Sequence, residues 1–203
     1  MRVSRAQAEA NRQRVLTVAS EIFRERGFDG TSIGDVMQAS GLTHGGFYGQ
    51  FRSKDDLVAE AAADGFGQLL ARVDAVVEGA EDPLASFVHW YLSPAHRDAV
   101  GAGCALAALA PDGARAAPEI RASFAKGAEA YLEHLTRLAP ATTDAERRQW
   151  AMAALATLIG ALQLSRLVMD RDLSQAILDA AAGRLLAGRA PSGPTVKSQR
   201  PTG

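Results

Sequence analysis

The sequence predicts an all-α protein of about nine helices, and three observations lead to this prediction. Apolar residues recur at helical rather than strand spacing, alanine is abundant, and no stretch alternates polar and apolar residues for long enough to form a sheet. The chain has 203 residues, of which 47% are hydrophobic, so it can bury a sizeable core in one or two domains.

The opening of the chain predicts a first helix from about Ala8 to Arg26. Its apolar stripe is Val15, Ala19, Ile22 and Phe23, at the spacing of one helix face. Gly27 follows where a left-handed residue ends many helices.

A short second helix is expected next. Thr31 or Ser32 can cap it, and Ile33, Val36 and Met37 would form its inward face. We expect it to stop at Gly41, because glycine accepts the positive φ of a tight turn between helices.

The segment after this turn, residues 43–51, is expected to be a third helix with Thr43 as its capping residue. It contains three glycines, each costing about 1 kcal/mol against alanine inside a helix, so it would not be helical alone. Phe47 and Phe51, four residues apart, are the expected anchors into the core. Helix, glycine turn and helix together predict a helix-turn-helix unit. The glycines are Gly45, Gly46 and Gly49.

The outer side of this segment is expected to approach duplex DNA, because absent side chains let a backbone come close to the groove walls. His44, Tyr48 and Gln50 are left to reach outward. Ser53 and Asp56 predict a capping box at the start of a long fourth helix, whose free N–H groups can seat a phosphate beside Lys54.

The charge of the N-terminal end agrees with DNA binding, whereas the charge of the whole chain does not. The net charge is −1 and the sequence pI about 6.4, whereas nucleic-acid-binding domains are typically basic. Residues 1–28, however, hold six arginines against three glutamates, so we expect this end to face phosphate.

Four short motifs in this order resemble the signature of the TetR family of helix-turn-helix regulators. They are Thr31-Ser-Ile-Gly-Asp-Val-Met37, Ser40-Gly-Leu-Thr43, Gly46-Phe-Tyr48 and Phe51-Arg-Ser-Lys-Asp-Asp-Leu57, and the resemblance covers roughly residues 11–60.

The resemblance implies a homodimer that binds double-stranded operator DNA and acts mostly as a transcriptional repressor. A small-molecule effector would release it from the operator. The resemblance places Thr43, His44, Gly45 and Gly46 in the major groove. It also implies phosphate contacts by Tyr48, Lys54 and either Thr31 or Ser32. Gly49 departs from the larger residue common in the family, so a contact that some relatives make is missing here.

We therefore expect a DNA-binding domain over residues 8–60, with its motif at about 32–51, an effector and dimerisation domain over 61–188, and a disordered tail over 189–203. Within the second domain, Pro83 and Pro118 predict helix starts, and Ser93-Pro94 a break. Pro111-Asp-Gly113 predicts a turn.

The end of this domain is expected to hold two long helices. Thr143 and Glu146 predict a capping box for a helix to about Asp170, and a last helix should end at Gly188. Residues 149–165 lack charge but contain two glutamines and a threonine, so we interpret them as a buried helix rather than a membrane span.

The two sites of the second domain are predicted less specifically. By resemblance, the last two long helices form the dimer interface, and we expect it to include Leu155, Leu158, Leu162, Ile177 and Leu185, with the internal core as the alternative for each residue. The expected lining of an effector pocket, with core packing as the alternative for each residue, is Phe66, Leu70, Trp90, Tyr91, Cys104, Phe124 and Tyr131.

Several residues have a second interpretation. Cys104 is a redox sensor or, in apolar surroundings, an inert thiol. His89 and His96 are two metal ligands or unrelated, and no third ligand supports the metal. Tyr48 could instead be a half-buried aromatic and His44 merely solvated. Asp55 and Asp56 are interpreted as structural.

Two other classes of protein fit the sequence less well. An all-helical enzyme is not supported, because no nucleophile elbow, zinc-protease or phosphate-loop motif occurs, and we expect no cofactor and no metal. A helical carrier of small molecules leaves the arginine-rich first helix unexplained. A single cysteine and an opening without an apolar segment favour the cytoplasm, with no membrane partner.

Overall fold

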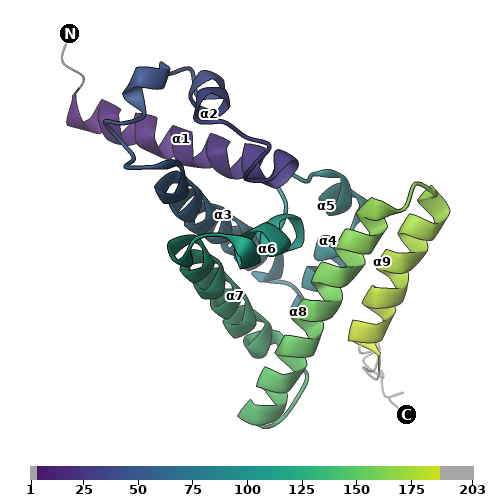
Figure 1. Cartoon of the computed structure of the whole chain (residues 1–203). Helices are drawn as coiled ribbons and strands as arrows, with labels where there is room; N and C mark the ends of the chain where they lie inside the picture. The colour runs from purple at the N-terminus through teal and green to yellow at the C-terminus, as the bar shows by residue number, and fades with distance from the viewer. Residues whose placement is uncertain (1–3, 188–203) are drawn as a thin grey trace, which may run out of the picture.

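The computed structural model describes residues 4–187, and every regular element in that range is helical (Figure 1). The nine α-helices confirm the predicted fold class for this part of the chain. In order, the elements are α1 Arg5–Arg26, α2 Ile33–Ala39, the 3₁₀ turn η1 His44–Gly46, α3 Lys54–Val77, α4 Pro83–Tyr91, α5 Pro94–Asp98, α6 Ala105–Arg115, α7 Pro118–Leu138, α8 Asp144–Leu167 and α9 Arg171–Leu186.

Most helix starts lie where side-chain chemistry predicts them. Ser32 and Thr143 head complete capping boxes, in which the side chain three residues later bonds back to the capping residue. Pro83 and Pro118 occupy first-turn positions, where a missing N–H costs nothing. Ser53 also caps its helix, but Asp56 bonds the backbone N–H of Arg52 instead of that of Ser53.

The turn expected at Pro111–Gly113 is wrong, because Pro111 lies inside α6. Proline cannot bond the carbonyl oxygen four residues earlier, which here belongs to Ala107. Gln163 of α8 donates its Nε2 to that oxygen at 3.0 Å. A partner from another helix thus satisfies the carbonyl that proline leaves free.

The predicted ends of the last helices are only partly testable. Helix α8 ends at Leu167, a little before the expected Asp170, which instead caps α9. The expected stop at Gly188 and the tail over 189–203 lie outside the described residues.

The elements form a head and a body joined by α3 (Figure 1). The head consists of α1, α2 and η1. Helix α3 packs on α1 at one end and on α7 in the body, while α8 packs on α7 and α9. The core is continuous through both parts: Phe28 of the head packs edge-on against Phe124 of α7, and Phe124 against Phe66 of α3.

Helix α8 packs against α5, α6, α7 and α9 but leaves one strip of its surface open. Ala151, Ala154, Leu158 and Leu162 are buried, whereas Met152 and Leu164 on the same helix are about half exposed. By length and composition α8 is the single helix among residues 4–187 that qualifies as a candidate membrane span. The interpretation of residues 149–165 as a buried helix holds for the faces that pack on the rest of the chain, while one strip stays open.

Candidate functional site

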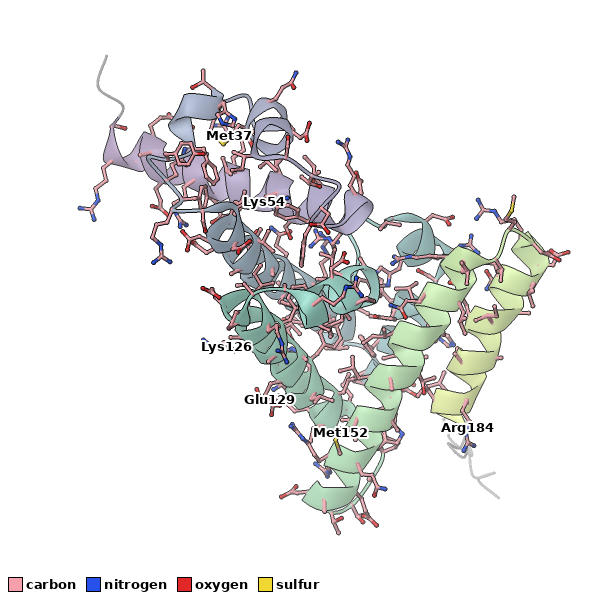
Figure 2. All side chains as sticks on the ribbon, viewed as in Figure 1. Met37, Lys54, Lys126, Glu129, Met152 and Arg184 are labelled. Atoms are coloured by element: carbon pink, nitrogen blue, oxygen red, sulfur yellow. The ribbon has the colours of Figure 1, made fainter. Side chains whose placement is uncertain are left out.

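Two phenylalanines hold the glycine-rich segment, residues 43–51, onto the head. Phe47 and Phe51 are 0% and 2% exposed, and their rings stack with centroids 5.5 Å apart. Met37 of α2, labelled in Figure 2, is also fully buried and packs beneath Gly46. The prediction that the two rings anchor the segment is confirmed.

The segment is less regular than expected. Only His44–Gly46 forms a 3₁₀ turn, and Thr43 makes no side-chain capping bond. A backbone bond from Phe51 N to Phe47 O closes one further turn. The prediction of a regular third helix capped by Thr43 is wrong for this structure, because the glycine content disfavours the helix that the anchors alone would allow.

The outer side of the segment is open. Thr43, His44, Gly45 and Gly49 are exposed, and the Tyr48 side chain is 67% exposed. The Tyr48 ring lies edge-on against the rings of Phe47 and His44, at centroid distances of 5.1 and 6.3 Å. This exposure excludes the alternative that Tyr48 is a half-buried aromatic.

Thr31 and Ser32 differ sharply in accessibility. Thr31 is 1% exposed, and its hydroxyl donates to the carbonyl oxygen of Gly27 at 3.0 Å, so its side chain is not available for a phosphate. Ser32 is exposed, although its hydroxyl donates to Asp35 Oδ2 at 2.6 Å. Hydrogen bonds from Ser32 lower the pKa of Asp35. Of the predicted pair, only Ser32 lies at the surface.

Lys54 lies where the head meets the body (Figure 2), and its ammonium donates to the carbonyl oxygen of Phe28 at 2.5 Å. Gln50 is half-buried, its Oε1 is covered and its Nε2 donates to the Gly46 carbonyl oxygen at 3.2 Å, so the prediction that Gln50 reaches outward is wrong. Arg52, which the motif contains but sequence reasoning passed over, has a side chain 90% exposed and pairs with Asp56 at 2.6 Å. Its side-chain hydrogen bond lowers the pKa of Asp56. Asp56 is therefore structural, as expected.

The arginines of α1 do not all face outward, which corrects the charge argument. Arg12 pairs with Glu60 and lies 4.8 Å from the Phe51 ring centroid. Arg24 is buried and donates to Gly101 O at 2.5 Å and to Ser20 Oγ at 2.7 Å. Among the described residues of the helix, Arg5, Arg14 and Arg26 remain exposed.

Residues 15–61, which contain the glycine-rich segment and both of its flanking turns, match the model of the bacterial regulatory proteins of the tetR family. The chain belongs to the TetR family.

Curated relatives of this TetR-family chain are similar mainly over the head. The HTH-type transcriptional regulator AcrR of Shigella flexneri is 37% identical over 59 residues, 29% of this chain and 27% of the relative. The HTH-type transcriptional repressor KstR2 of Mycolicibacterium smegmatis is 29% identical over 79 residues, 39% of this chain and 38% of the relative. The chain thus matches less than two fifths of the length of these relatives. These relatives are named regulators and not enzymes.

A longer match and the solved structures extend the likeness to the body. An uncharacterised HTH-type regulator of Mycobacterium tuberculosis is 29% identical over 170 residues, covering 80% of this chain and 87% of the relative. The reduced form of NemR from Escherichia coli has a TM-score of 0.74 at 18% identity, covering 87% of this chain and 95% of that one. A TetR-family regulator from Cytophaga hutchinsonii has a TM-score of 0.74 at 21% identity, covering 93% and 98%. At these identities the structures show a shared fold.

The residues expected to line an effector pocket lie in two places rather than one. Phe66 and Leu70 line an open groove of about 220 Å³ between α3 and α7. Tyr91, Cys104 and Tyr131 are buried deeper in the body, and Trp90 stacks on His96 at a centroid distance of 5.2 Å. Phe124 packs edge-on against Phe66 of the groove and against Phe28.

Most residues expected at a dimer interface are already covered by their own chain. Leu155, Leu158, Leu162 and Leu185 are at most 8% exposed, and Ile177 is half-buried. The apolar surface of α8, α9 and their connection is made by other residues, which we call the apolar stripe: Met152, Leu164, Leu167, Met169 and Leu173. The sequence predicted an apolar interface on these helices but not which of their faces turns inward.

The surroundings of Cys104 disfavour a redox sensor, and those of His89 and His96 disfavour a metal site. Cys104 is fully buried, and burial raises the pKa of its thiol, which disfavours the reactive thiolate. His96 is buried with Nδ1 2.7 Å from Tyr91 O, while His89 is exposed. Among residues 4–187, no group of three His, Cys, Asp or Glu side chains could hold a metal ion.

Proposed function

We propose that this chain is a transcriptional repressor that binds duplex operator DNA as a homodimer and is released by a small molecule. The observation that carries DNA binding is the glycine-rich segment. Its inner rings are buried, while Thr43, His44 and Tyr48 stand open on its outer side. The glycines of this segment disfavour a helix, and only its inner side is anchored to the core. Its open outer side is therefore suited to bind a partner as large as a DNA duplex.

The chemistry of these side chains divides their roles. His44 and Thr43 are hydrogen-bonding groups that can read base edges, and Gly45 and Gly46 allow the backbone into the major groove. Tyr48 and Ser32 offer neutral donors to phosphate oxygens, whereas the Gln50 amide is turned back to Gly46. Lys54, at the first position of α3, adds a charge beside the free N–H groups of that helix. We add Arg52 as a further phosphate contact, because its side chain is exposed beside Lys54.

Dimerisation is assigned to the apolar stripe of α8 and α9. Several exposed apolar side chains on neighbouring helices mark an interaction surface. Gly160 on α8 and Gly183 on α9 have open space around them, so a second helix can approach closely. Pairing the two helices with their twins would form a four-helix bundle about a two-fold axis.

The boundary between the two proposed domains lies where the head meets the body. We assign residues 8–60 to DNA binding and residues 61–188 to effector binding and dimerisation, with α3 crossing from one to the other. In a dimer the two heads must meet major grooves about 34 to 36 Å apart, or a multiple of that distance. A ligand that favours a conformer with different spacing lowers operator affinity. We place this regulator in the cytoplasm, where its DNA lies.

Fluorescence anisotropy with the DNA upstream of the chain's own gene tests the proposal. We expect binding that exceeds binding to random DNA by at least about a thousandfold at physiological salt. Binding to neither DNA at low ionic strength would overturn the proposal and favour a helical small-molecule carrier.

A further inference from the structure

Four polar side chains meet in the interior where α4, α5, α6 and α7 come together. Tyr91, Cys104 and Tyr131 are at most 1% exposed and His96 is 7% exposed. The Tyr91 ring centroid lies 4.6 Å from that of His96 and 6.4 Å from that of Tyr131. The Cys104 thiol lies close enough to Tyr91 to affect the pKa of its hydroxyl. We call these four residues the polar cluster.

The polar cluster contains hydrogen-bonding atoms that the rest of the described chain does not satisfy. The hydroxyl of Tyr131 and the Nε2 of His96 are buried without a hydrogen-bond partner, and the Tyr91 hydroxyl has only the weakly bonding Cys104 thiol beside it. Buried polar groups nearly always have partners, since burial removes their bonds to water. Phenylalanine would fill either tyrosine position without this cost, so the two hydroxyls need another explanation.

The hydrogen bonds around His96 define what its free nitrogen can do. Nδ1 lies 2.7 Å from the carbonyl oxygen of Tyr91, so Nδ1 carries the proton and donates it there. Nε2 is therefore an acceptor. Burial lowers the pKa of His96 to about 4, so the ring is neutral at pH 7.

The other members of the cluster are neutral as well. Burial raises the pKa of the Tyr91 and Tyr131 hydroxyls well above the ordinary value and also raises the pKa of the Cys104 thiol. The nearest cation, Arg166, already donates to the carbonyl oxygens of Arg97 at 2.8 Å and His96 at 3.0 Å. The atoms of the polar cluster that lack partners are therefore neutral donors and acceptors, which suit an uncharged group best.

We propose that the effector of this regulator is a small uncharged molecule with a hydroxyl or carbonyl group, and that the hydroxyls of Tyr91 and Tyr131 hold this group. Each hydroxyl can donate one hydrogen bond and accept others, so the pair serves either an alcohol or a ketone. The aromatic surroundings, including Phe87 at 5.8 Å from the Tyr91 ring, suit an apolar body. This inference rests on the proposed ligand-released repressor.

The position of the cluster also connects it to the head. Cys104 precedes α6 directly, and residues 99–103 form the loop that leads to it. Arg24 of α1 donates to Gly101 O at 2.5 Å, and Arg72 of α3 donates to Ala102 O at 2.6 Å. A ligand that displaces the start of α6 therefore moves a loop that is bonded to the first helix of the head and to the helix that joins head and body.

Thermal unfolding with four probes of similar size tests the ligand class. The probes are benzyl alcohol and acetophenone, which are uncharged, and benzoate and benzylamine, which are charged at pH 7. The proteins are the full chain, Tyr91→Phe/Tyr131→Phe, and the control Thr136→Val. Thr136 is on α7 like Tyr131, but its hydroxyl has a partner in Leu132 O at 2.7 Å.

We expect millimolar benzyl alcohol and acetophenone to raise the Tm of the full chain and of Thr136→Val, but not that of the double variant. Without probe, the double variant should melt close to the wild-type Tm, since only the weak contact between Tyr91 and the Cys104 thiol is lost, whereas Thr136→Val should melt lower. No shift with either uncharged probe, an equal shift with the charged probes, or a shift that survives in the double variant would overturn the inference.

Operator binding separates this inference from the function on which it rests. The double variant should bind the upstream DNA as tightly as wild type, because neither hydroxyl touches the head. If both bind DNA but no uncharged probe stabilises the wild type, the effector assignment fails alone. If neither binds DNA, the proposed function fails, whatever the probes do.

Discussion

The side chains of residues 43–54 separate into those that hold the segment and those that face outward. Phe47 and Phe51 belong to the first group, and His44 and Tyr48 to the second. Lys54 belongs partly to both, since its ammonium bonds Phe28 O in the free protein. Base-reading and phosphate-binding residues give different signatures in titrations, which makes the assignment testable residue by residue.

We expect Lys54→Ala to weaken binding to every DNA sequence and to reduce the salt slope of log K by about 1, because one phosphate contact is lost. His44→Ala should instead change the preference among operator variants, at a cost of about 1–3 kcal/mol at one position. Anisotropy titrations over a range of salt measure both. Lys126→Ala is the control, since Lys126 is exposed on α7, away from the head (Figure 2). Equal losses on operator and random DNA for both variants would contradict the roles.

His96 gives the protein a pH dependence with a definite sign. Its pKa is lowered from 6.5 to about 4 by burial, so the unfolded chain binds more protons between these values. The free energy of unfolding should therefore fall as pH falls from about 6.5 to about 4, by up to about 3 kcal/mol from this residue.

Urea unfolding of His96→Gln across this pH range measures the effect. The variant should lose this part of the pH dependence, while His89→Gln, which changes an exposed histidine of α4, should keep it. Parallel pH curves for wild type and His96→Gln would show that the buried ring does not titrate as described.

At the scale of elements, α6 depends on its neighbour α8. Pro111 leaves the Ala107 carbonyl oxygen without its usual helical donor, and Gln163 of α8 supplies one at 3.0 Å. We expect Gln163→Leu to lower the free energy of unfolding by about 1–2 kcal/mol, because a buried acceptor loses its partner. The exposed Gln149 of the same helix offers the matched control, Gln149→Leu, with little expected change.

A double-mutant cycle tests the cause. Replacing the proline, as Pro111→Ala, restores an N–H that can bond Ala107 O. In that background Gln163→Leu should cost clearly less than in the wild type. Additive losses measured by denaturant unfolding would mean that the glutamine acts in some other way.

The elements also show which features a sequence can predict. Helix starts at Ser32, Pro83 and Thr143 follow from chemistry within a few residues, so they were predicted correctly. The helical course through Pro111 depends on Gln163, fifty-two positions away in the chain, and no local pattern could indicate it. The irregular segment after Gly41 was anticipated as unstable but not as a single 3₁₀ turn, because the outcome depends on how firmly Phe47 and Phe51 are packed.

For the site residues, too, the sequence predicts local features but not those that depend on tertiary packing. The exposed group at His44 and Tyr48 follows from the motif, whereas the burial of Thr31 beneath Gly27 depends on tertiary packing. Leu158 and Leu162 were recognised as apolar, yet their facing inward depends on where α7 and α9 lie. Arg24 shows the limit for charge, since its guanidinium bonds a loop more than seventy residues later.

At the scale of the whole molecule, the apolar stripe should set the oligomeric state. Leu164→Glu together with Leu173→Glu places charges on a surface that we assign to the twin subunit, so the chain should become monomeric. Sedimentation should show this at micromolar protein with unchanged helix content, and operator binding should weaken because two heads no longer act together. Ala122→Glu on α7 is the control, an exposed site outside the stripe. A double variant that remains dimeric would place the interface elsewhere.

The central claim is that the outer side of residues 43–51 enters the major groove, and tethered cleavage tests it most directly. Cys104 is fully buried, so Gly49→Cys would supply the accessible thiol for an iron chelate. A Cβ at Gly49 would meet only the Gly46 carbonyl oxygen, at 3.7 Å, so the change should be tolerated. The account predicts two clusters of operator cleavage separated by one helical turn, 10 to 10.5 base pairs, or a multiple of it. Cleavage no stronger than that from a chelate on Lys126→Cys would contradict it.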